Sequence, residues 1–265
     1  MGRTPTASDM NVSEGVLNRI AEARSASVLT GAGVSAESGI PTFRGAGGIW
    51  EKYDFRKLAT PQGFKEDPEL VWEWYQLRQR EMLKAAPNPA HLVIADMERH
   101  YPQFSVLTQN IDGMHKRAGS NHIVELHGSI WRLRCVRDGL VTQTDAPVVE
   151  IPPLCQCGSI LRPDVVWFGE PLSDEVLDAA SRAAASSEVM FVIGTSAVVY
   201  PAAALPIITK NSGGLVIEVN TEPTDVTTYA DVSLMGPAGK MLPALWNLVR
   251  RTESFMKEHP FIPNR

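Results

Sequence analysis

A glycine-rich turn after an apolar strand is the part of this sequence best suited to bind phosphate. Between Ser27 and Arg44, Gly31 and Gly33 let the backbone turn tightly and approach a ligand closely. Backbone N–H groups near Ser35 to Ser38 can meet the charge of a pyrophosphate. The usual fingerprint has a third glycine three residues after the second, but here the next one is Gly39. The turn therefore predicts a dinucleotide cradle and disfavours a dehydrogenase; taken alone, an ordinary strand-to-helix turn is an equally good interpretation.

His127 is the side chain best suited to move a proton. It follows a predicted strand and precedes Gly128, so its ring can project at the carboxyl edge of a parallel sheet, where open α/β folds bind ligands. An imidazole titrates near neutral pH and can accept a proton from a hydroxyl group at physiological pH. A single histidine is more often structural, and His115, on a predicted helical stretch, is interpreted that way. Only the match of its His-Gly pair to the ELHGS motif given below reverses this for His127, which is then predicted to be the catalytic base.

The elements that would position these residues alternate between strands and helices. Apolar strands are predicted before Gly31 and at 104–107, 123–126, 189–193 and 215–219. Helices are predicted at 13–24, 68–85 and 89–99, from residue 201 onward and at about 239–257. This alternation predicts an α/β fold with a Rossmann-like, doubly wound parallel sheet. Between 132 and 162 a Pro-rich, cysteine-bearing stretch predicts a smaller inserted module that is rich in β structure.

Length and charge narrow the class of protein. The 265 residues suffice for one large domain with insertions. Residues 1–12 are predicted to be a flexible tail and 13–265 the catalytic domain, with a helical insertion at about 45–90 and the cysteine-bearing one at 132–162. A net charge of −5 argues against nonspecific nucleic-acid binding. Neither an 18-residue apolar run nor an apolar leader is present in the sequence, so no membrane association and a cytoplasmic location are predicted.

Six segments, in order along the chain, carry a specific resemblance. They are GAGVSAESGIPTFRG at 31–45, TQNIDGMHKRAG at 108–119, ELHGS at 125–129, RPDVVWFGE at 162–170, GTSAVVYP at 194–201 and IEVN at 217–220. With these segments the chain resembles the sirtuins, which are NAD-dependent protein-lysine deacylases, over nearly its whole length. The resemblance implies that NAD is consumed as a co-substrate, because the acyl-lysine amide oxygen attacks the ribose carbon that carries nicotinamide.

The resemblance also implies a set of NAD-binding residues. The QNID run lines the ribose and nicotinamide pocket, where Asp112 accepts from the carboxamide; without this context, Asn-x-Asp after a strand is as often a turn or a helix cap. Arg44 is expected to pair with the pyrophosphate and Phe43 to cover the reactive carbon. The turn at 194–196 is expected to contact the ribose and phosphate, and residues 220–222 are expected to contact the adenosine half of NAD. The full set is Gly31, Ala32, Gly33, Ser35, Phe43, Arg44, Gln109, Asn110, Ile111, Asp112, Gly194, Thr195, Ser196, Asn220, Thr221, Glu222 and Ala238.

The segment RPDVVWFGE resembles the strand with which the family binds its peptide substrate through backbone pairing. Val166 is expected to touch the acyl amide, and Phe168 and Gly169 are included as further substrate contacts. A buried strand is a compatible alternative, and core packing is the favoured interpretation for Trp167 and Phe168. The predicted partners are therefore acyl-lysine proteins or peptides.

Tyr75 and Arg78 lie three residues apart on a predicted helix and so share a face. A Tyr-x-x-Arg pair here resembles the class III sirtuin subgroup that removes succinyl and malonyl groups, in which the guanidinium and the phenol hold the acyl carboxylate. Ala59 would leave room for the longer acyl chain. In isolation, such a pair on a charged helix is usually a solvated face. With the match, an acidic-acyl preference with weaker deacetylation is predicted.

The three cysteines lie between 135 and 157, which favours a metal site over a disulfide framework. The sirtuin module normally holds structural Zn²⁺ with four cysteines, but only Cys135, Cys155 and Cys157 are present here. Asp138 stands where the second cysteine is expected, and zinc accepts carboxylate oxygen. A weaker zinc site with Asp138 or water as fourth ligand, and loss of the metal, both remain open.

The predicted function is thus an NAD-dependent protein-lysine deacylase that prefers succinyl- and malonyl-lysine and releases nicotinamide and O-acyl-ADP-ribose. An alternative is an enzyme that transfers ADP-ribose to protein or water in the same cleft. A third is an NAD-sensing module without turnover. Val166, Tyr75 and Arg78 favour the deacylase over ADP-ribose transfer, and a sensor would not need a base such as His127.

Overall fold

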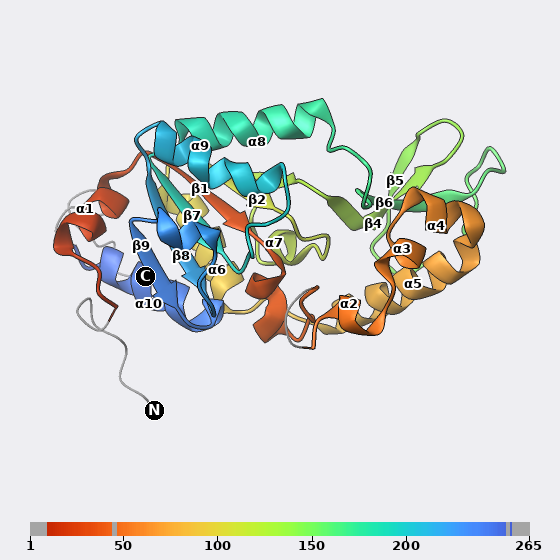
Figure 1. Cartoon of the computed structure of the whole chain (residues 1–265), viewed down its shortest axis with the longest axis horizontal. Helices are drawn as coiled ribbons and strands as arrows, with labels where there is room; N and C mark the ends of the chain where they lie inside the picture. Colours follow the sequence, from red (N-terminus) through yellow and green to blue (C-terminus); the bar gives the residue numbers. More distant parts are fainter. Residues whose placement is uncertain (1–9, 44–46, 253–254, 256–265) are drawn as a thin grey trace, which may run out of the picture.

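The computed structural model describes residues 10–43, 47–252 and 255. Within these residues, a six-stranded parallel sheet has the order β3-β2-β1-β7-β8-β9 (Figure 1). The chain adds β2 and β3 on one side of β1 and then returns to its other side with β7, which makes the carboxyl ends of β1 and β7 the switch point where such folds bind ligands. The strands are β1 (Ser25–Thr30), β2 (Gln103–Thr108), β3 (Ile123–Glu125), β7 (Val189–Ile193), β8 (Leu215–Asn220) and β9 (Val232–Met235). The predicted Rossmann-like, doubly wound fold is confirmed.

Helices cover both faces of this sheet (Figure 1). On one face α8 (Asp174–Ser186) and α9 (Leu205–Asn211) share a hydrophobic core with Leu29 of β1. On the other, α1 (Glu14–Glu22), α6 (Pro89–His100) and α10 (Ala238–Val249) share a core with Val28. Because both faces are covered, β1 and β7 are buried along their whole length. In the described part of the chain, no helix is long and apolar enough to cross a membrane.

A second lobe, at the right of Figure 1, is built from two separate segments. One contributes α2 (Ile49–Lys52), α3 (Phe55–Leu58), α4 (Pro61–Glu66) and α5 (Pro68–Lys84). The other contributes an antiparallel sheet of β4 (Gly128–Cys135), β5 (Val141–Gln143) and β6 (Leu161–Val165). Both segments share one hydrophobic core. Trp72 Nε1 donates to the Leu161 carbonyl (2.8 Å) and Gln79 Nε2 to that of Ile130 (2.9 Å), so α5 is fixed against the cysteine-bearing module.

Short helical turns complete the fold: η1 (Ala32–Ser38), α7 (Met114–Arg117), η2 (Ala202–Ala204) and η3 (Asp225–Thr228). The predicted helices at 13–24, 68–85 and 89–99 are confirmed within one or two residues as α1, α5 and α6, with Ser13 and Asn88 as N-caps of α1 and α6. The predicted extent of the last helix is wrong, because α10 ends at Val249 and a turn follows. The sequence patterns missed α8, whose fully buried positions are only alanines, and the four-residue strand β9.

Candidate active site

Two strand-end turns touch each other at the switch point of the sheet. Gly31 follows β1, Gly194 follows β7, and the Gly33 N–H donates to the Gly194 carbonyl (2.8 Å). A Cβ on Gly33 would lie 2.7 Å from Gly194 Cα, and Gly194 itself has φ +60°, in the left-handed region. A side chain at any of these glycines would push the turns apart, as each added Cβ would meet backbone atoms at less than 3 Å. The edge therefore presents bare backbone where a dinucleotide phosphate can approach.

Polar side chains tie the ends of four strands into one strip. Gln109 Nε2 donates to Thr195 Oγ1 (2.9 Å), and Asn220 Nδ2 donates to the Thr195 carbonyl (2.9 Å). Asn110 Nδ2 donates to the Gly31 carbonyl (3.0 Å). These contacts join the carboxyl ends of β2, β1, β7 and β8 in the order in which the strands lie in the sheet. The strip has the extended form that a dinucleotide needs.

The remaining predicted NAD contacts flank this strip. Ser196, Thr221 and Glu222 are exposed beside it, and the buried Ala238 begins α10. The ring of Phe43 stacks on Trp50 with centroids 5.5 Å apart. Arg44, the predicted partner of the pyrophosphate, lies outside the described residues.

Asp112 is buried at one end of the strip, with 4% of its surface exposed. Its carboxylate accepts from the Ser35 hydroxyl (2.8 Å) and from the Met114 N–H (2.8 Å). Burial raises the pKa of Asp112, against these hydrogen bonds and the charges of Arg78 and Arg117. A small cavity adjoins it, lined by Ala32, Ile40, Pro41, Phe43, Arg78, Met82, Asn110, Ile111 and Asp112. Its lining combines apolar walls with a few convergent polar groups, the composition typical of small-molecule sites.

His91 belongs to this network and was missed by the sequence patterns. It is fully buried, its Nδ1 accepts from the Asn88 N–H (3.2 Å), and its Nε2 lies 3.3 Å from the Ser35 hydroxyl. Because Nδ1 accepts, Nε2 carries the proton and donates to Ser35. Burial lowers the pKa of His91 to about 4, so the ring is neutral at physiological pH. A histidine at the third position of a helix that follows an Asn-Pro cap was the available signal.

We expect His91 to make the protein acid-sensitive. An unfolded histidine titrates near 6.5, whereas His91 stays neutral in the folded state down to a pKa of about 4. Between these values the unfolded state binds the extra proton, so stability is lost as pH falls. We expect the free energy of unfolding, measured by urea titration, to fall between pH 7.5 and 5.0 in both proteins. In His91→Gln this fall should be about 2 kcal/mol smaller than in the unsubstituted protein. Equal losses in both proteins would contradict this assignment.

His127 lies in the turn between β3 and β4, at the same edge of the sheet. Its Nδ1 is 3.0 Å from the Gln109 carbonyl, which can only accept, so Nδ1 carries the proton and Nε2 has a free lone pair. Its own carbonyl accepts from the Val166 N–H (2.9 Å), which fixes the backbone. Burial lowers the pKa of His127 below its usual value, and the bond to Gln109 opposes this only in part. A neutral imidazole with an available Nε2 is the form that a general base requires.

Tyr75 and Arg78 are buried, with 2% and 4% of their surfaces exposed, so the alternative of a solvated helix face is wrong. The Arg78 guanidinium carbon lies 4.9 Å from the ring centroid of Phe43 and 5.1 Å from that of Trp74. Among the described residues, its buried Nε has no hydrogen-bond partner. The Tyr75 phenol accepts from Trp167 Nε1 (2.8 Å), and burial raises the pKa of Tyr75 to about 12, so the phenol keeps a proton to donate.

The predicted peptide-binding segment lies beside His127. Its strand, β6, ends at Val165, and Val166 follows with its N–H bonded to His127. Trp167 is buried as expected, but core packing of Phe168 is wrong: 39% of Phe168 is exposed. The Phe168 N–H donates to the carbonyl of the buried Ala59 (2.9 Å), and Gly169 is exposed next to it. The segment therefore runs from the base to the lobe that carries α5.

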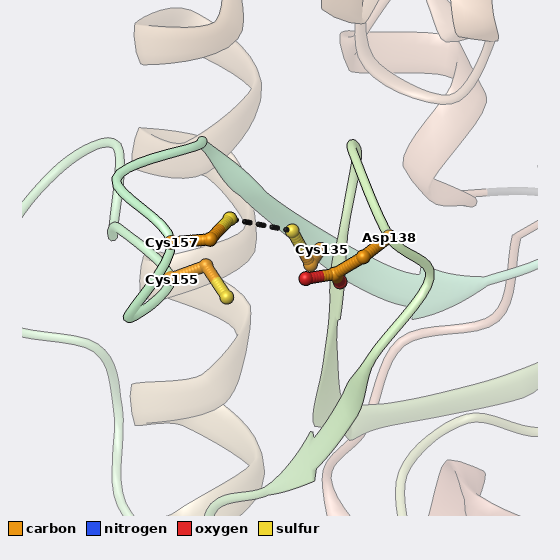
Figure 2. Close-up of side chains that lie close together, drawn as sticks. All are labelled: Cys135, Asp138, Cys155 and Cys157. Carbon is orange, nitrogen blue, oxygen red and sulfur yellow. Dashed lines mark hydrogen bonds between the residues drawn. The ribbon is translucent and has the colours of Figure 1, made fainter.

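Four potential metal ligands converge in the second lobe. Figure 2 shows Cys135 and Asp138, from the end of β4 and the turn after it, facing Cys155 and Cys157 of another turn. Their ligand atoms all lie within 4.8 Å of one another, and the sulfurs of Cys135 and Cys157 are 3.5 Å apart. Tetrahedral zinc with bonds of about 2.3 Å places two sulfurs roughly 3.8 Å apart. The donor set and its spacing therefore fit a zinc ion.

Comparison with known proteins identifies the family to which this chain belongs. The Sir2 family model matches residues 31–201. A protein named NAD-dependent protein deacylase 2, from Pyrobaculum aerophilum, is 54% identical over 237 residues that cover 89% of this chain and 95% of the relative. A solved Sir2 homologue variant with ADP-ribose has a TM-score of 0.88 and 47% identity, and covers 91% of this chain and 97% of its own. A Sir2 homologue–NAD complex has a TM-score of 0.84 and 48% identity, and covers 90% of this chain and 94% of its own. The chain belongs to the Sir2 family and is an NAD-dependent protein deacylase.

Proposed function

We propose that this enzyme removes succinyl and malonyl groups from protein lysines in preference to acetyl groups. The observation that carries the proposal is the burial of Arg78 with an unpartnered Nε, on the wall of the cavity that also contains Asp112. A buried cation without a paired anion costs free energy, which a ligand carboxylate can recover. Malonyl and succinyl groups carry such a carboxylate, whereas an acetyl group does not.

The residues around Arg78 are suited to the same ligand. The planar guanidinium can donate two parallel hydrogen bonds to a carboxylate. Tyr75, one helical turn earlier on α5, keeps its phenol proton and can donate a further one. Burial lowers the pKa of Arg78, and its interactions with Tyr75, Glu81 and Asp112 oppose this shift without a direct ion pair among the described residues. Because an arginine side chain titrates far above neutral pH, the guanidinium stays charged and available.

In this proposal the NAD co-substrate lies along the strip of strand ends. When bound, it supplies an electrophilic ribose carbon from which nicotinamide departs. Asn110 and Asp112 hold the carboxamide, the glycine turns at Gly31 and Gly194 accommodate the pyrophosphate, and Asn220 faces the adenosine side. His127 Nε2 accepts a proton from a ribose hydroxyl. Val166 orients the acyl amide beside that base.

The direct test is a matched panel of acetyl-, malonyl- and succinyl-lysine peptides of one sequence, incubated with the enzyme and NAD and followed by product mass. We expect kcat/KM for the malonyl or succinyl peptide to exceed that for the acetyl peptide by about tenfold or more, as one additional charge-assisted hydrogen bond would produce. Equal values, or a higher value for acetyl, would refute the acyl preference. Release of nicotinamide without an acylated peptide would instead favour ADP-ribose transfer or NAD hydrolysis.

We also propose that Cys135, Cys155, Cys157 and Asp138 hold a structural zinc ion, which takes no part in the chemistry assigned to His127. A carboxylate in place of one thiolate should weaken the site. Asp138→Cys is therefore expected to retain zinc against about tenfold more chelator than the unsubstituted protein, in a competition read by a zinc-sensitive dye. Cys157→Ser should lose the metal and lower the Tm. Absence of zinc from protein purified with added zinc would rule the site out.

A further inference from the structure

A buried carboxylate in the central sheet has no role in the chemistry described so far. Glu218 lies in β8, with 1% of its surface exposed, in the run Leu215–Asn220 whose other buried residues are all apolar. Residues two apart on a strand share a face, so Glu218 lies on the same face as Val216, which packs in the core under α8 and α9. A carboxylate is rarely placed there, because its desolvation is costly unless hydrogen bonds compensate it.

Hydroxyl groups provide that compensation. Glu218 accepts from Thr224 Oγ1 (2.5 Å), Thr227 Oγ1 (2.6 Å) and Ser233 Oγ (2.8 Å). Ser233 is the residue directly opposite on β9, whereas the two threonines come from the loop that leaves β8. In the described chain, no ion pair reaches this carboxylate. Most hydrogen bonds to Glu218 therefore come from one loop.

Both threonine hydroxyls have a second function in that loop. Thr224 Oγ1 also accepts from the Val226 N–H (3.1 Å), and Thr227 Oγ1 accepts from the Thr224 N–H (2.8 Å). These bonds cap the start of η3, where Thr224 and Thr227 together form a capping box. Since each hydroxyl directs its only proton to Glu218, its lone pairs face the backbone. The carboxylate thereby sets the orientation of the cap.

The loop held in this way carries the residues proposed to face the adenosine half of NAD. Asn220 is two residues after Glu218; its Nδ2 donates to the Thr195 carbonyl, and its carbonyl accepts from the Gly236 N–H (2.7 Å). Residues 221–223 therefore span from Asn220, fixed on the strip, to Thr224, fixed on Glu218. We infer that Glu218 is a positioning residue that holds the adenosine-binding loop in its binding-competent shape. This inference rests on the NAD placement proposed above.

Glu218→Gln is the sharpest substitution, because it preserves size. An amide offers one acceptor oxygen and one NH₂ group, so one of the two threonines would face a donor instead of an acceptor. We expect the KM for NAD and the Kd of ADP-ribose each to rise about tenfold, as loss of one or two buried hydrogen bonds implies. At saturating NAD, kcat should stay within about twofold, because His127 and Asp112 belong to other segments.

Threonine variants keep the test independent of how well Glu218→Gln folds. Thr227→Val removes the hydroxyl at nearly constant shape, and Thr227→Ser restores it. Thr228→Val is the matched control, since the Thr228 hydroxyl, in the same turn, bonds to the Asp225 carbonyl (2.7 Å) and not to Glu218. Each variant is measured by calorimetry with ADP-ribose, by steady-state kinetics and by thermal unfolding. Asn220→Ala reports separately whether the loop faces the co-substrate.

The expected pattern is weaker ADP-ribose binding in Glu218→Gln and Thr227→Val, with recovery in Thr227→Ser and no change in Thr228→Val. A lower Tm with unchanged Kd would make Glu218 merely structural and overturn the inference, provided that Asn220→Ala weakens binding. If Asn220→Ala also leaves the Kd unchanged, the proposed placement of the adenosine half fails, and the inference fails with it. A fall in kcat without a rise in KM would likewise overturn it.

Discussion

His127→Asn is expected to lower kcat for deacylation by about a thousandfold, which lies within the range that a general base contributes. The asparagine amide can still donate to the Gln109 carbonyl, as the Nδ1–H of His127 does now. It has no basic nitrogen to replace Nε2, so only proton transfer is lost. Rates are measured with saturating NAD and acylated peptide.

Binding provides the control for this variant. The His127 ring contacts the strip of strand ends through the backbone carbonyl of Gln109 and not through the Gln109 side chain. The Kd of ADP-ribose should therefore stay within about twofold of the unsubstituted value. A parallel loss of binding would show that His127 shapes the pocket instead of moving a proton.

The pH profile of the unsubstituted enzyme follows from the same residue. Burial lowers the pKa of His127, and the base acts only when neutral. The value of kcat should therefore be flat from pH 8 to 7 and fall only below the usual imidazole value of about 6.5. A fall that begins above pH 7 would require a raised pKa and would contradict the burial of this ring.

Much of the candidate site could be predicted because a parallel sheet gathers the ends of its strands. Gly31, Gln109, Gly194 and Asn220 each follow an apolar run, and the topology brings them to one edge. Local order in the sequence was therefore enough to group them. Local signals also located the cysteine cluster, although not its occupancy.

Contacts between distant segments could not be predicted in this way. The bond between Ser35 and His91 joins residues 56 positions apart. The local sequence around either residue does not predict this contact. The burial of Arg78 could not be predicted from the sequence either. The helix α5 has polar residues on several faces, yet the second lobe covers Arg78. Phe168 shows the converse, since an aromatic residue expected in the core lies exposed at the peptide segment. Tertiary packing decided these cases, and residue type alone was uninformative.

Arg78→Met is expected to lower kcat/KM for succinyl- and malonyl-lysine peptides by about a hundredfold or more, because a buried carboxylate would lose its charge-assisted partner. Activity on the acetyl-lysine peptide should stay within a few-fold, since that group makes no use of the guanidinium. The preference between acyl groups would then reverse. The readout is the ratio of the two kcat/KM values, which cancels any change in the amount of active enzyme.

Two further variants separate the carboxylate contact from general effects. Arg78→Lys keeps the charge but loses the planar fork, so it should recover only part of the succinyl activity. Arg80→Met, on the exposed face of the same helix, should leave both activities unchanged. Removal of a buried cation without an ion-pair partner among the described residues should not destabilise the fold, so the Tm of Arg78→Met is expected to be equal or higher. If Arg78→Met instead lost both activities equally, with a lower Tm, Arg78 would serve packing, and the carboxylate preference would have to arise elsewhere.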